Sequence, residues 1–203
     1  MLPRRALVVG GALLIAVALM ALAVPTEPLS VDRRWSDAMA SIESPALKEI
    51  ALVFNALGRG LGWALTLAAV SGVLLLRRRL TALVAFLVAE ALSSFLSAAL
   101  KALVGRPRPP DGLVHPVGSS FPSGHACYGS VTCIALVLLF TTPQRRARWW
   151  SLAGLGIAGM AWSRTYLQVH WLTDVIGGVL LGGGIVLTTF AAAQLGRVSS
   201  HAN

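Results

Sequence analysis

The sequence predicts an all-α fold, an integral membrane bundle of six transmembrane helices. Composition is the first reason: 56% of the 203 residues are hydrophobic and only 12% are charged, whereas soluble domains carry about 25% charged residues. Patterning is the second, because the apolar residues gather into six runs close to the ~20 residues that cross a bilayer as a helix. The runs cover 6–24, 56–76, 80–100, 124–140, 149–166 and 175–195.

The first run, 6–24, follows the start MLPRR and resembles the apolar core of a secretory signal peptide. Its 19 residues are long for such a core, so we expect an uncleaved first span. Apolar residues then recur at helical spacing in the next segment, which predicts a short amphipathic helix at the membrane interface. They are Val31, Trp35, Met39 and Ile42. Another helix is expected to begin at Ser44-Pro45, because serine favours the N-cap and proline the first turn.

The second and third runs each contain an ionisable residue. Arg59 is near the start of its run, and we expect it towards the interface. Glu90 is in the middle of the third run, eleven residues before Lys101, or about 16 Å at the helical rise. An ionisable group at this depth indicates a function by default. Nearby serines favour the alternative of a hydrogen-bonded packing contact: Ser93, Ser94 and Ser97.

The last three runs complete the bundle. The fourth and fifth are short and span a bilayer only if their polar flanks continue the helix. Gly178 and Gly182 in the sixth run are four residues apart, a spacing that lets helix backbones approach closely. We interpret these glycines as packing residues. Cys127 and Cys133 lack the spacing of a thiolate metal site, and small buried side chains are expected there.

Basic residues between the runs predict the orientation, since cytoplasmic loops carry the excess of Lys and Arg. With six spans these residues fall on one side: Arg4, Arg5, Arg77, Arg78, Arg79, Arg145, Arg146, Arg148 and Arg197. Both termini are then cytoplasmic, and 25–55, 101–123 and 164–174 lie on the other side. This topology accounts for most of the net charge of +9, so no nucleic-acid partner is expected.

Three polar clusters fall on that other side of the membrane. They are KALVGRPRP at 101–109, FPSGHA at 121–126 and SRTYLQVHWLTD at 163–174. Their cations Lys101, Arg108 and Arg164 suit phosphate oxygens, which guanidinium groups bind two at a time. Ser123 and Gly124 open a helix, whose free N–H groups favour an anion. Together these residues predict a site for phosphate or a similar oxyanion.

Two histidines supply the chemistry for a reaction at this site. His170 and Asp174 are four residues apart and share a helix face if the sixth helix starts early. A carboxylate bound to one ring nitrogen leaves the other free to attack. His125 could protonate a leaving oxygen and then deprotonate a water. No carboxylate cluster that would hold Mg²⁺ is visible on this side, and neither a metal nor a cofactor is expected.

These clusters resemble the three signature motifs of the type 2 phosphatidic acid phosphatase superfamily, membrane lipid phosphatases related to vanadium-dependent haloperoxidases. The first motif is Lys, six residues, Arg-Pro, and here it is Lys101 and Arg108-Pro109. The second is Pro-Ser-Gly-His, here 122–125, and the third is Ser-Arg, five residues, His, three residues, Asp, here 163–174. The resemblance covers about 50–195 and leaves Arg106 outside the motifs, so we expect it to be a loop charge.

The resemblance implies a role for each motif residue. His170 would be the nucleophile that forms a phosphohistidine, Asp174 would orient it, and His125 would be the general acid and then the base. The phosphoryl oxygens would be held by Lys101, Arg108, Arg164, Ser123 and the Gly124 backbone, without a metal.

The expected substrate is a phosphomonoester or pyrophosphate of a membrane lipid, hydrolysed on the extracytoplasmic face. Phosphatidic acid, phosphatidylglycerol phosphate and undecaprenyl pyrophosphate are the candidates. A lipid phosphotransferase would use the same residues, and a transporter or binding protein is the alternative from another class. We expect the first helix and an amphipathic loop at 1–49, the catalytic core at 50–196 and a cytoplasmic tail at 197–203. The small size and the Ala, Leu, Gly and Arg bias indicate a bacterial cell membrane protein.

Overall fold

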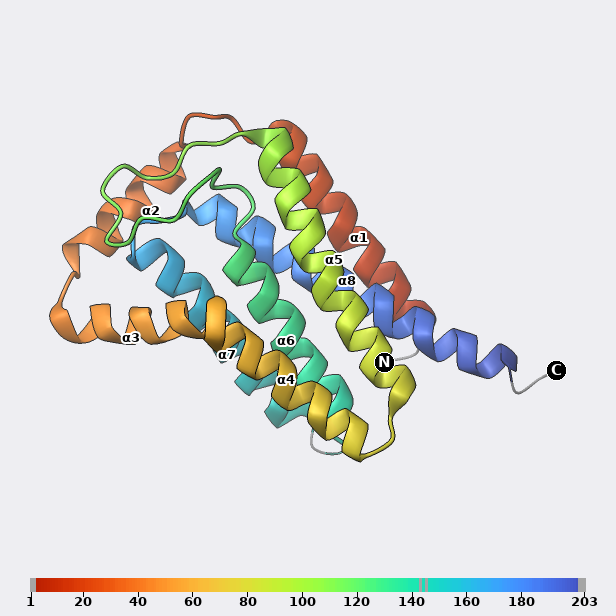
Figure 1. Ribbon diagram of the computed structural model, residues 1–203. Helices are drawn as coiled ribbons and strands as arrows, with labels where there is room; N and C mark the ends of the chain where they lie inside the picture. Colours follow the sequence, from red (N-terminus) through yellow and green to blue (C-terminus); the bar gives the residue numbers. More distant parts are fainter. Residues whose placement is uncertain (1–2, 143, 145, 201–203) are drawn as a thin grey trace.

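The computed structural model describes 3–142, 144 and 146–200, and for 197–200 only the backbone. Helices make up the architecture, with no strand in these described ranges (Figure 1). They are α1 (Pro3–Ala23), α2 (Ser30–Ser41), α3 (Pro45–Leu57), α4 (Gly60–Leu76), α5 (Leu80–Val104), α6 (Gly124–Phe140), α7 (Arg146–Tyr166) and α8 (Leu172–Ser200). The all-α expectation is confirmed for this part of the chain.

The number of membrane-spanning helices is confirmed only in part. Three described helices are long and apolar enough to cross a bilayer, α1, α5 and α8, and the bent pair α3–α4 makes a fourth if it counts as one span. The apolar α6 has only 17 residues, and α7, although 21 residues long, is not among the helices that are apolar enough. The expected six spans therefore depend on α6 and α7.

The second expected span is not one straight helix. The run at 56–76 begins inside α3, and the axis turns by 57° where α3 ends and α4 begins. Gly58 ends α3, Arg59 is extended with φ −152°, and Gly60 has φ +54°. That left-handed φ is favourable for glycine and costly for most side chains. The glycines at 58 and 60 therefore place a break here that the hydrophobic pattern does not reveal.

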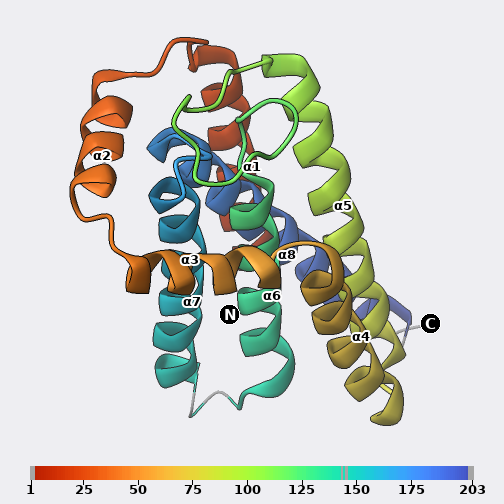
Figure 2. The same ribbon diagram turned by 60° about the vertical axis from the view of Figure 1, so that its left-hand side comes forward.

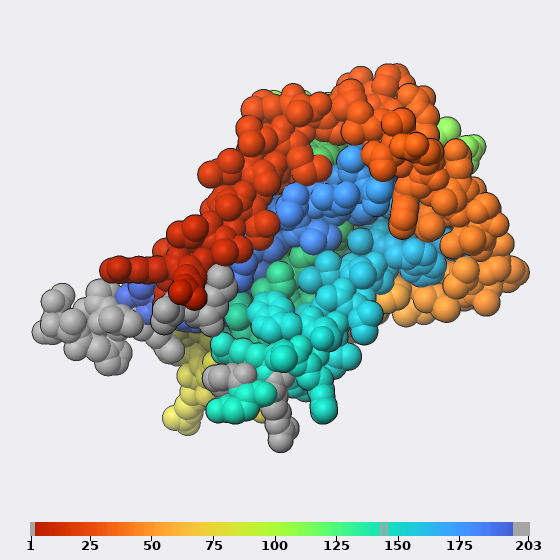
Figure 3. All heavy atoms as spheres, turned by 180° about the vertical axis from the view of Figure 1, so that it is seen from behind, coloured from red at the N-terminus to blue at the C-terminus, as the bar shows by residue number. Residues whose placement is uncertain are grey.

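Helix α8 is the centre of the bundle and packs against α1, α5, α6 and α7. Figure 3 shows it from behind, running between α1 and α7. The prediction for Gly178 and Gly182 is confirmed, because a Cβ at either position would overlap a backbone carbonyl of α6, that of Ser123 or Cys127. These two glycines let the backbones of α6 and α8 come into direct contact.

Two helices between α1 and α4, namely α2 and α3, flank the bundle (Figure 2). The predicted amphipathic helix is present as α2, which packs on α7 and α8 through buried Met39 and Asp32. The predicted N-cap of α3 is also present, since Ser44 Oγ accepts a hydrogen bond from the Leu47 amide at 3.4 Å. Burial of Asp32, a charged residue, shows that α2 contributes more than an apolar face to this packing.

Glu90 makes the packing contact expected as the alternative to a function. Its side chain is buried in α5 and accepts a hydrogen bond at 3.0 Å from Thr132 of α6. The Ser93 hydroxyl instead donates to the Glu90 backbone carbonyl. The carboxyl group thus links α5 to α6 within the bundle.

The two ends of the bundle differ in character. The loops 105–123 and 167–171 lie at one end, and the turn at 77–79 and the start of α7 lie at the other (Figure 1). The basic residues Arg77, Arg78, Arg79, Arg146 and Arg148 are therefore at the end away from those loops. Arg145 and the Arg197 side chain fall outside the described residues. The expected tail at 197–203 begins as helix, because α8 continues to Ser200, and 201–203 are not described.

Candidate active site

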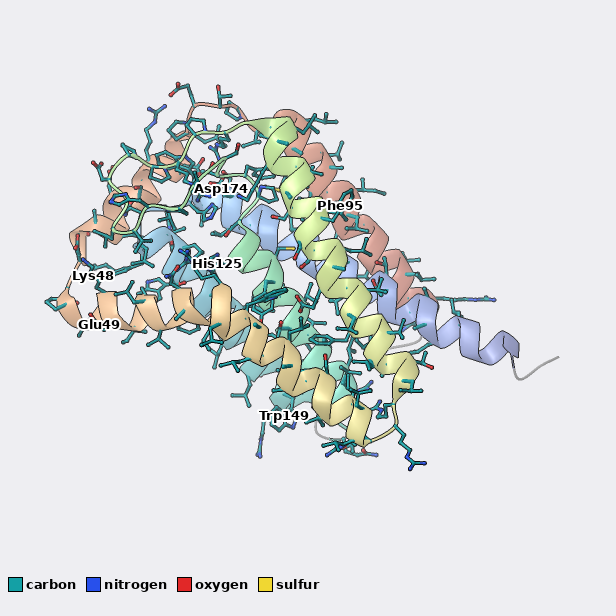
Figure 4. The ribbon with its side chains drawn as sticks, viewed as in Figure 1. Lys48, Glu49, Phe95, His125, Trp149 and Asp174 are labelled. Atoms are coloured by element: carbon teal, nitrogen blue, oxygen red, sulfur yellow. The ribbon has the colours of Figure 1, made fainter. Side chains whose placement is uncertain are left out.

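A cavity of about 120 Å³ brings the three polar clusters together. Six of the eight predicted site residues line it: Lys101, Arg108, Gly124, His125, Arg164 and His170. The other two, Ser123 and Asp174, are fully buried next to lining residues. Figure 4 shows His125 and Asp174 at the loop end of the bundle, on α6 and α8. The three clusters and residues 55–59 at the α3–α4 bend are far apart in the sequence and together line one cavity.

The hydrogen bonds of His170 define its tautomer. Arg108 Nη1 lies 3.2 Å from His170 Nε2. A guanidinium group only donates, so Nε2 accepts, and the ring proton is then on Nδ1. Nδ1 lies 3.5 Å from Asp174 Oδ2, which is longer than a typical hydrogen bond but places the carboxylate opposite the proton. The lone pair of Nε2 is therefore directed at the Arg108 guanidinium, which lines the same cavity.

Burial controls the charge of His170. Desolvation lowers the pKa of His170 from 6.5 to about 3, with Lys101 and Arg108 adding to the shift and Asp174 opposing it. The ring is consequently neutral at physiological pH, as a nitrogen nucleophile requires. Burial also lowers the pKa of Arg108, although a guanidinium stays charged at neutral pH.

Backbone carbonyls hold two of the three cations in place. Lys101 Nζ donates to the carbonyls of Ser119 and Ser120 at 2.8 and 3.1 Å. Arg108 donates to the carbonyls of Gly118, Ser119 and Val169, so the Ser119 carbonyl accepts from both cations. The carbonyl oxygens of the loop 118–120 therefore stabilise Lys101 and Arg108. Carbonyls have no formal charge, so the cavity remains cationic.

Arg164 is held by a side chain that no sequence pattern had selected. The Arg164 guanidinium is buried, and its Nη1 donates to Asn55 Oδ1 of α3 at 2.8 Å. Arg164 Nη2 is buried and has no hydrogen-bond partner among the described residues. A buried donor without an acceptor is costly, so this N–H group is available to an oxyanion in the cavity.

Of the two residues expected to bind phosphate at the start of α6, only Gly124 lines the cavity. Ser123 does not line the cavity, and its Oγ is the N-cap acceptor for the Ala126 amide at 3.5 Å. Its own amide donates to the Asp174 carbonyl at 2.9 Å, which joins α6 to α8. Gly124 lines the cavity and has no side chain to cover the first turn of α6. The structure thus gives Ser123 a capping contact and leaves the Gly124 backbone beside the cavity.

His125 lies against the bend between α3 and α4. Its Nε2 is 3.3 Å from the Asn55 carbonyl, which can only accept, so Nε2 carries a proton. A Cβ on Gly58 would overlap the His125 ring, lying 3.1 Å from Cγ and Nε2 and closer still to Cδ2. Residues 55–58 therefore orient His125, and sequence patterns had not selected Asn55 or Gly58.

Arg106 is not the loop charge that the sequence suggested. It is fully buried and forms ion pairs of 2.7 Å with both Asp174 of α8 and Asp32 of α2. A buried guanidinium between two carboxylates is a structural element of the site, because an unpaired charge at this depth would be very unfavourable. The proline-rich sequence around Arg106 did not predict these ion pairs. Asp174 is 68 positions and Asp32 is 74 positions from Arg106 in the sequence.

A second cavity of about 340 Å³ adjoins the first between α4, α5 and α6. The two share four lining residues, Arg59, Lys101, Gly124 and His125. Trp63 and Tyr128 are among the other residues that line the larger space. Arg59 is exposed at the junction, at the bend rather than within a helix. The small cationic cavity thus opens into a larger and less polar one.

The helical bundle is apolar and of membrane type, and its histidine–aspartate pair lies at a cavity lined by three cations. In the described residues no group of three His, Cys, Asp or Glu side chains could hold a metal ion. The sequence model of the PAP2 superfamily matches residues 82–196, more than half of the chain. The chain belongs to the PAP2 superfamily.

Two relatives and two solved structures are similar to this chain. It is 40% identical over 81 residues to an undecaprenyl-diphosphatase of Sulfolobus acidocaldarius, a match that takes in 39% of this chain and 35% of that relative. It is 33% identical over 174 residues to phosphatidylglycerophosphatase B of Bacillus subtilis, covering 81% and 84% of the two chains. The expected family is thereby confirmed.

Among solved structures, a transmembrane PAP2-type phosphatidylglycerolphosphate phosphatase from Bacillus subtilis is similar with a TM-score of 0.78 and 25% identity. This match covers 93% of the present chain and 96% of the other. The LpxE structure from Aquifex aeolicus has a TM-score of 0.64 at 22% identity, covering 83% and 99%, and supports the fold alone.

Proposed function

We propose that the protein is a membrane lipid phosphatase that hydrolyses a phosphomonoester or pyrophosphate through a phosphohistidine. One observation carries the proposal. The neutral His170 ring places Nε2, which accepts a hydrogen bond from Arg108, in a cavity lined by three cations. That arrangement suits a phosphoryl group, whose charged oxygens are stabilised by the cations while the nitrogen approaches the phosphorus. Membership of a phosphatase superfamily and the names of the relatives support the same activity.

In the first step, Nε2 of His170 attacks the phosphorus, and the bond between phosphorus and the lipid-side oxygen breaks. Asp174 faces the proton on Nδ1 and offsets the positive charge that the ring acquires. The leaving oxygen takes a proton from His125 in its imidazolium form, which becomes neutral; the negative charge of the bound phosphoryl group favours that protonated form.

In the second step, His125 takes a proton from a water molecule, which attacks the phosphorus of the phosphohistidine. The bond between phosphorus and Nε2 breaks, inorganic phosphate leaves, and both histidines return to their starting states. Lys101, Arg108 and Arg164 hold the charged oxygens through both steps, and Arg164 Nη2 is the donor left free to do so.

The adjoining cavity accommodates the lipid. It runs from the phosphate site along α4, α5 and α6 and is lined by Trp63, Ala98 and Tyr128. A hydrocarbon chain can lie there and remain in the bilayer while its phosphate reaches His170. This placement supports sideways entry of the lipid between helices.

The substrate candidates differ in their number of phosphates. Phosphatidic acid has one, whereas phosphatidylglycerol phosphate and undecaprenyl pyrophosphate have two. Arg59 lies where the small cavity meets the larger one, so its charge is near the position of a second phosphate. This position favours the two-phosphate lipids.

The orientation is also part of the proposal. The site lies at the loop end of the bundle, and Arg77, Arg78, Arg79, Arg146 and Arg148 lie at the other end. If α6 and α7 with their flanks also span the bilayer, the positive-inside tendency puts the site on the extracytoplasmic face.

The test is phosphate release by purified protein in mixed micelles with EDTA present. The panel contains undecaprenyl pyrophosphate, phosphatidylglycerol phosphate, phosphatidic acid and a water-soluble phosphomonoester. His170→Ala should abolish release, and His115→Ala, in an exposed part of the loop, should not. Phosphate transferred from radiolabelled lipid to the protein should be recovered on His170. Absence of release, or release that His170→Ala leaves intact, contradicts the proposal.

A further inference from the structure

Arg106 shares its charge between two carboxylates. Its Nη1 is 2.7 Å from Asp174 Oδ1, and its Nη2 is 2.7 Å from Asp32 Oδ2. All three side chains are fully buried. With both carboxylates ionised, the three groups carry a net charge of −1, since one cation faces two anions. Asp174 also faces the His170 ring, so this cluster is electrically part of the nucleophile's environment.

Asp32 is fixed in place by the first turn of α8 as well. Its Oδ1 accepts hydrogen bonds from the Thr173 amide and hydroxyl at 2.9 and 3.0 Å. Its Oδ2 accepts from the Leu29 amide at 3.1 Å. A carboxylate at the N-terminus of a helix is stabilised by the free amides there. Asp32 is therefore a cap for α8 that α2 supplies, and it lies outside the residues 82–196 that match the superfamily.

The charge of Asp32 matters because the surroundings of His170 are otherwise positive. When a phosphoryl group joins Nε2 while Nδ1 keeps its proton, the ring becomes cationic. Lys101 from α5 and Arg108 from the loop oppose that charge, and His125 of α6 and Arg164 of α7 line the same cavity. Asp174 is the anion in direct contact with the ring. If Arg106 were paired with Asp174 alone, their charges would cancel and the ring would face no net negative charge.

We propose that Asp32 is a positioning residue for the reaction: by pairing with Arg106 and capping α8, it leaves the charge of Asp174 available to the His170 ring. The amphipathic helix α2 is thus part of the active-site framework and not a surface lid. The inference rests on the proposed phosphatase function. It predicts an effect on the chemical step, because Asp32 does not line the cavity that holds the substrate.

The experiment compares Asp32→Asn, Arg106→Gln and the double variant with the wild type in the micelle assay, measuring kcat and KM separately. Asp37→Asn is the matched control, because Asp37 is exposed on the same helix. Asp32→Asn should lower kcat by on the order of tenfold or more, the effect of removing a unit charge several ångströms away in a buried site. KM should change by less than about twofold.

The double variant separates charge from structure. Removing Asp32 and Arg106 together restores a net charge of −1 at Asp174, so its kcat should exceed that of Asp32→Asn. Asp32→Glu keeps the charge and should retain more activity than Asp32→Asn. Each variant is first checked for native size and thermal unfolding in detergent; if Asp32→Asn does not fold, the comparison of Asp32→Glu and the double variant with wild type decides.

Each outcome has a definite meaning. A folded Asp32→Asn protein with wild-type kcat, or a double variant no more active than Asp32→Asn, overturns the inference and leaves the phosphatase proposal standing. A wild-type protein that releases no phosphate from any lipid overturns the proposed function and, with it, this inference. A low kcat in Asp32→Asn that the double variant relieves supports the electrostatic role.

Discussion

Gly58 is the point at which the bend between α3 and α4 contacts His125, and replacing it with alanine tests whether the bend orients that histidine. The backbone at Gly58 has φ −92°, which alanine adopts without strain, so the substitution acts only through the added methyl group. That group would overlap Cδ2 of His125 and lie 3.1 Å from its Cγ and Nε2. Carbon atoms prefer 3.5–4.0 Å.

The size of the effect follows from this overlap. The His125 ring must shift by roughly 1 Å to reach ordinary contact distance, which disturbs its 3.3 Å contact with the Asn55 carbonyl. A displacement of that size in a reacting group costs about a hundredfold in rate, or about 2.7 kcal/mol in the activation free energy. We therefore expect kcat of Gly58→Ala to fall by about a hundredfold, with thermal unfolding showing a folded protein.

Gly72→Ala is the control, because Gly72 is in the middle of α4 and nothing lies within 4 Å of an added Cβ. It should keep wild-type kcat and be at least as stable, since alanine favours helix over glycine by about 1 kcal/mol. Phosphate release from one lipid, followed at saturating substrate, measures both variants. A folded Gly58→Ala protein with kcat within twofold of wild type would refute the assignment of the bend as the support for His125.

Three further predictions concern neighbouring residues. Asn55→Ala removes the acceptor of Arg164 Nη1 and should lower kcat/KM about tenfold, the cost of one hydrogen bond to a charged group; a folded Asn55→Ala protein with wild-type kcat/KM would contradict the contact. Arg59→Gln should reduce kcat/KM for phosphatidylglycerol phosphate and undecaprenyl pyrophosphate about tenfold relative to phosphatidic acid, and an unchanged ratio would remove Arg59 from substrate selection. The pKa of His170 is about 3 in the folded protein and 6.5 in the unfolded chain. Below pH 6.5 the unfolded state therefore binds a proton that the folded state does not. The free energy of unfolding should fall by up to about 1.4 kcal/mol for each pH unit below 6.5. Calorimetry between pH 5 and 7 should show a smaller slope in His170→Asn; equal slopes would contradict the shift.

The site residues could be predicted because the spacings that identify them are local in the sequence. His170 and Asp174 are separated by one helical turn, and Ser123 and Gly124 begin a helix wherever that helix goes. Such spacings are present in the linear sequence, and their relation to the three superfamily motifs selected all eight positions. The N-cap at Ser44 and the packing glycines Gly178 and Gly182 were predictable for the same reason.

The supports of the site were not predictable in this way. Arg106 resembled a loop cation because its partners, Asp32 and Asp174, are 74 and 68 residues away. Asn55 lay in an apolar stretch with no pattern to connect it with Arg164, 109 residues later. A pairing of this kind leaves no periodicity, so one sequence alone does not reveal it.

Composition and local spacing were sufficient for the helical class and the apolar character, and together with the motif resemblance they selected the candidate site residues, because burial in a bilayer and the geometry of one helical turn act on neighbouring residues. The bend at residues 58–60, the burial of Arg106 between two carboxylates and the capping of α8 by Asp32 depended on the packing of distant helices. A buried charge is tolerated only where its partners converge in three dimensions. Folding is what brings those partners together around His170.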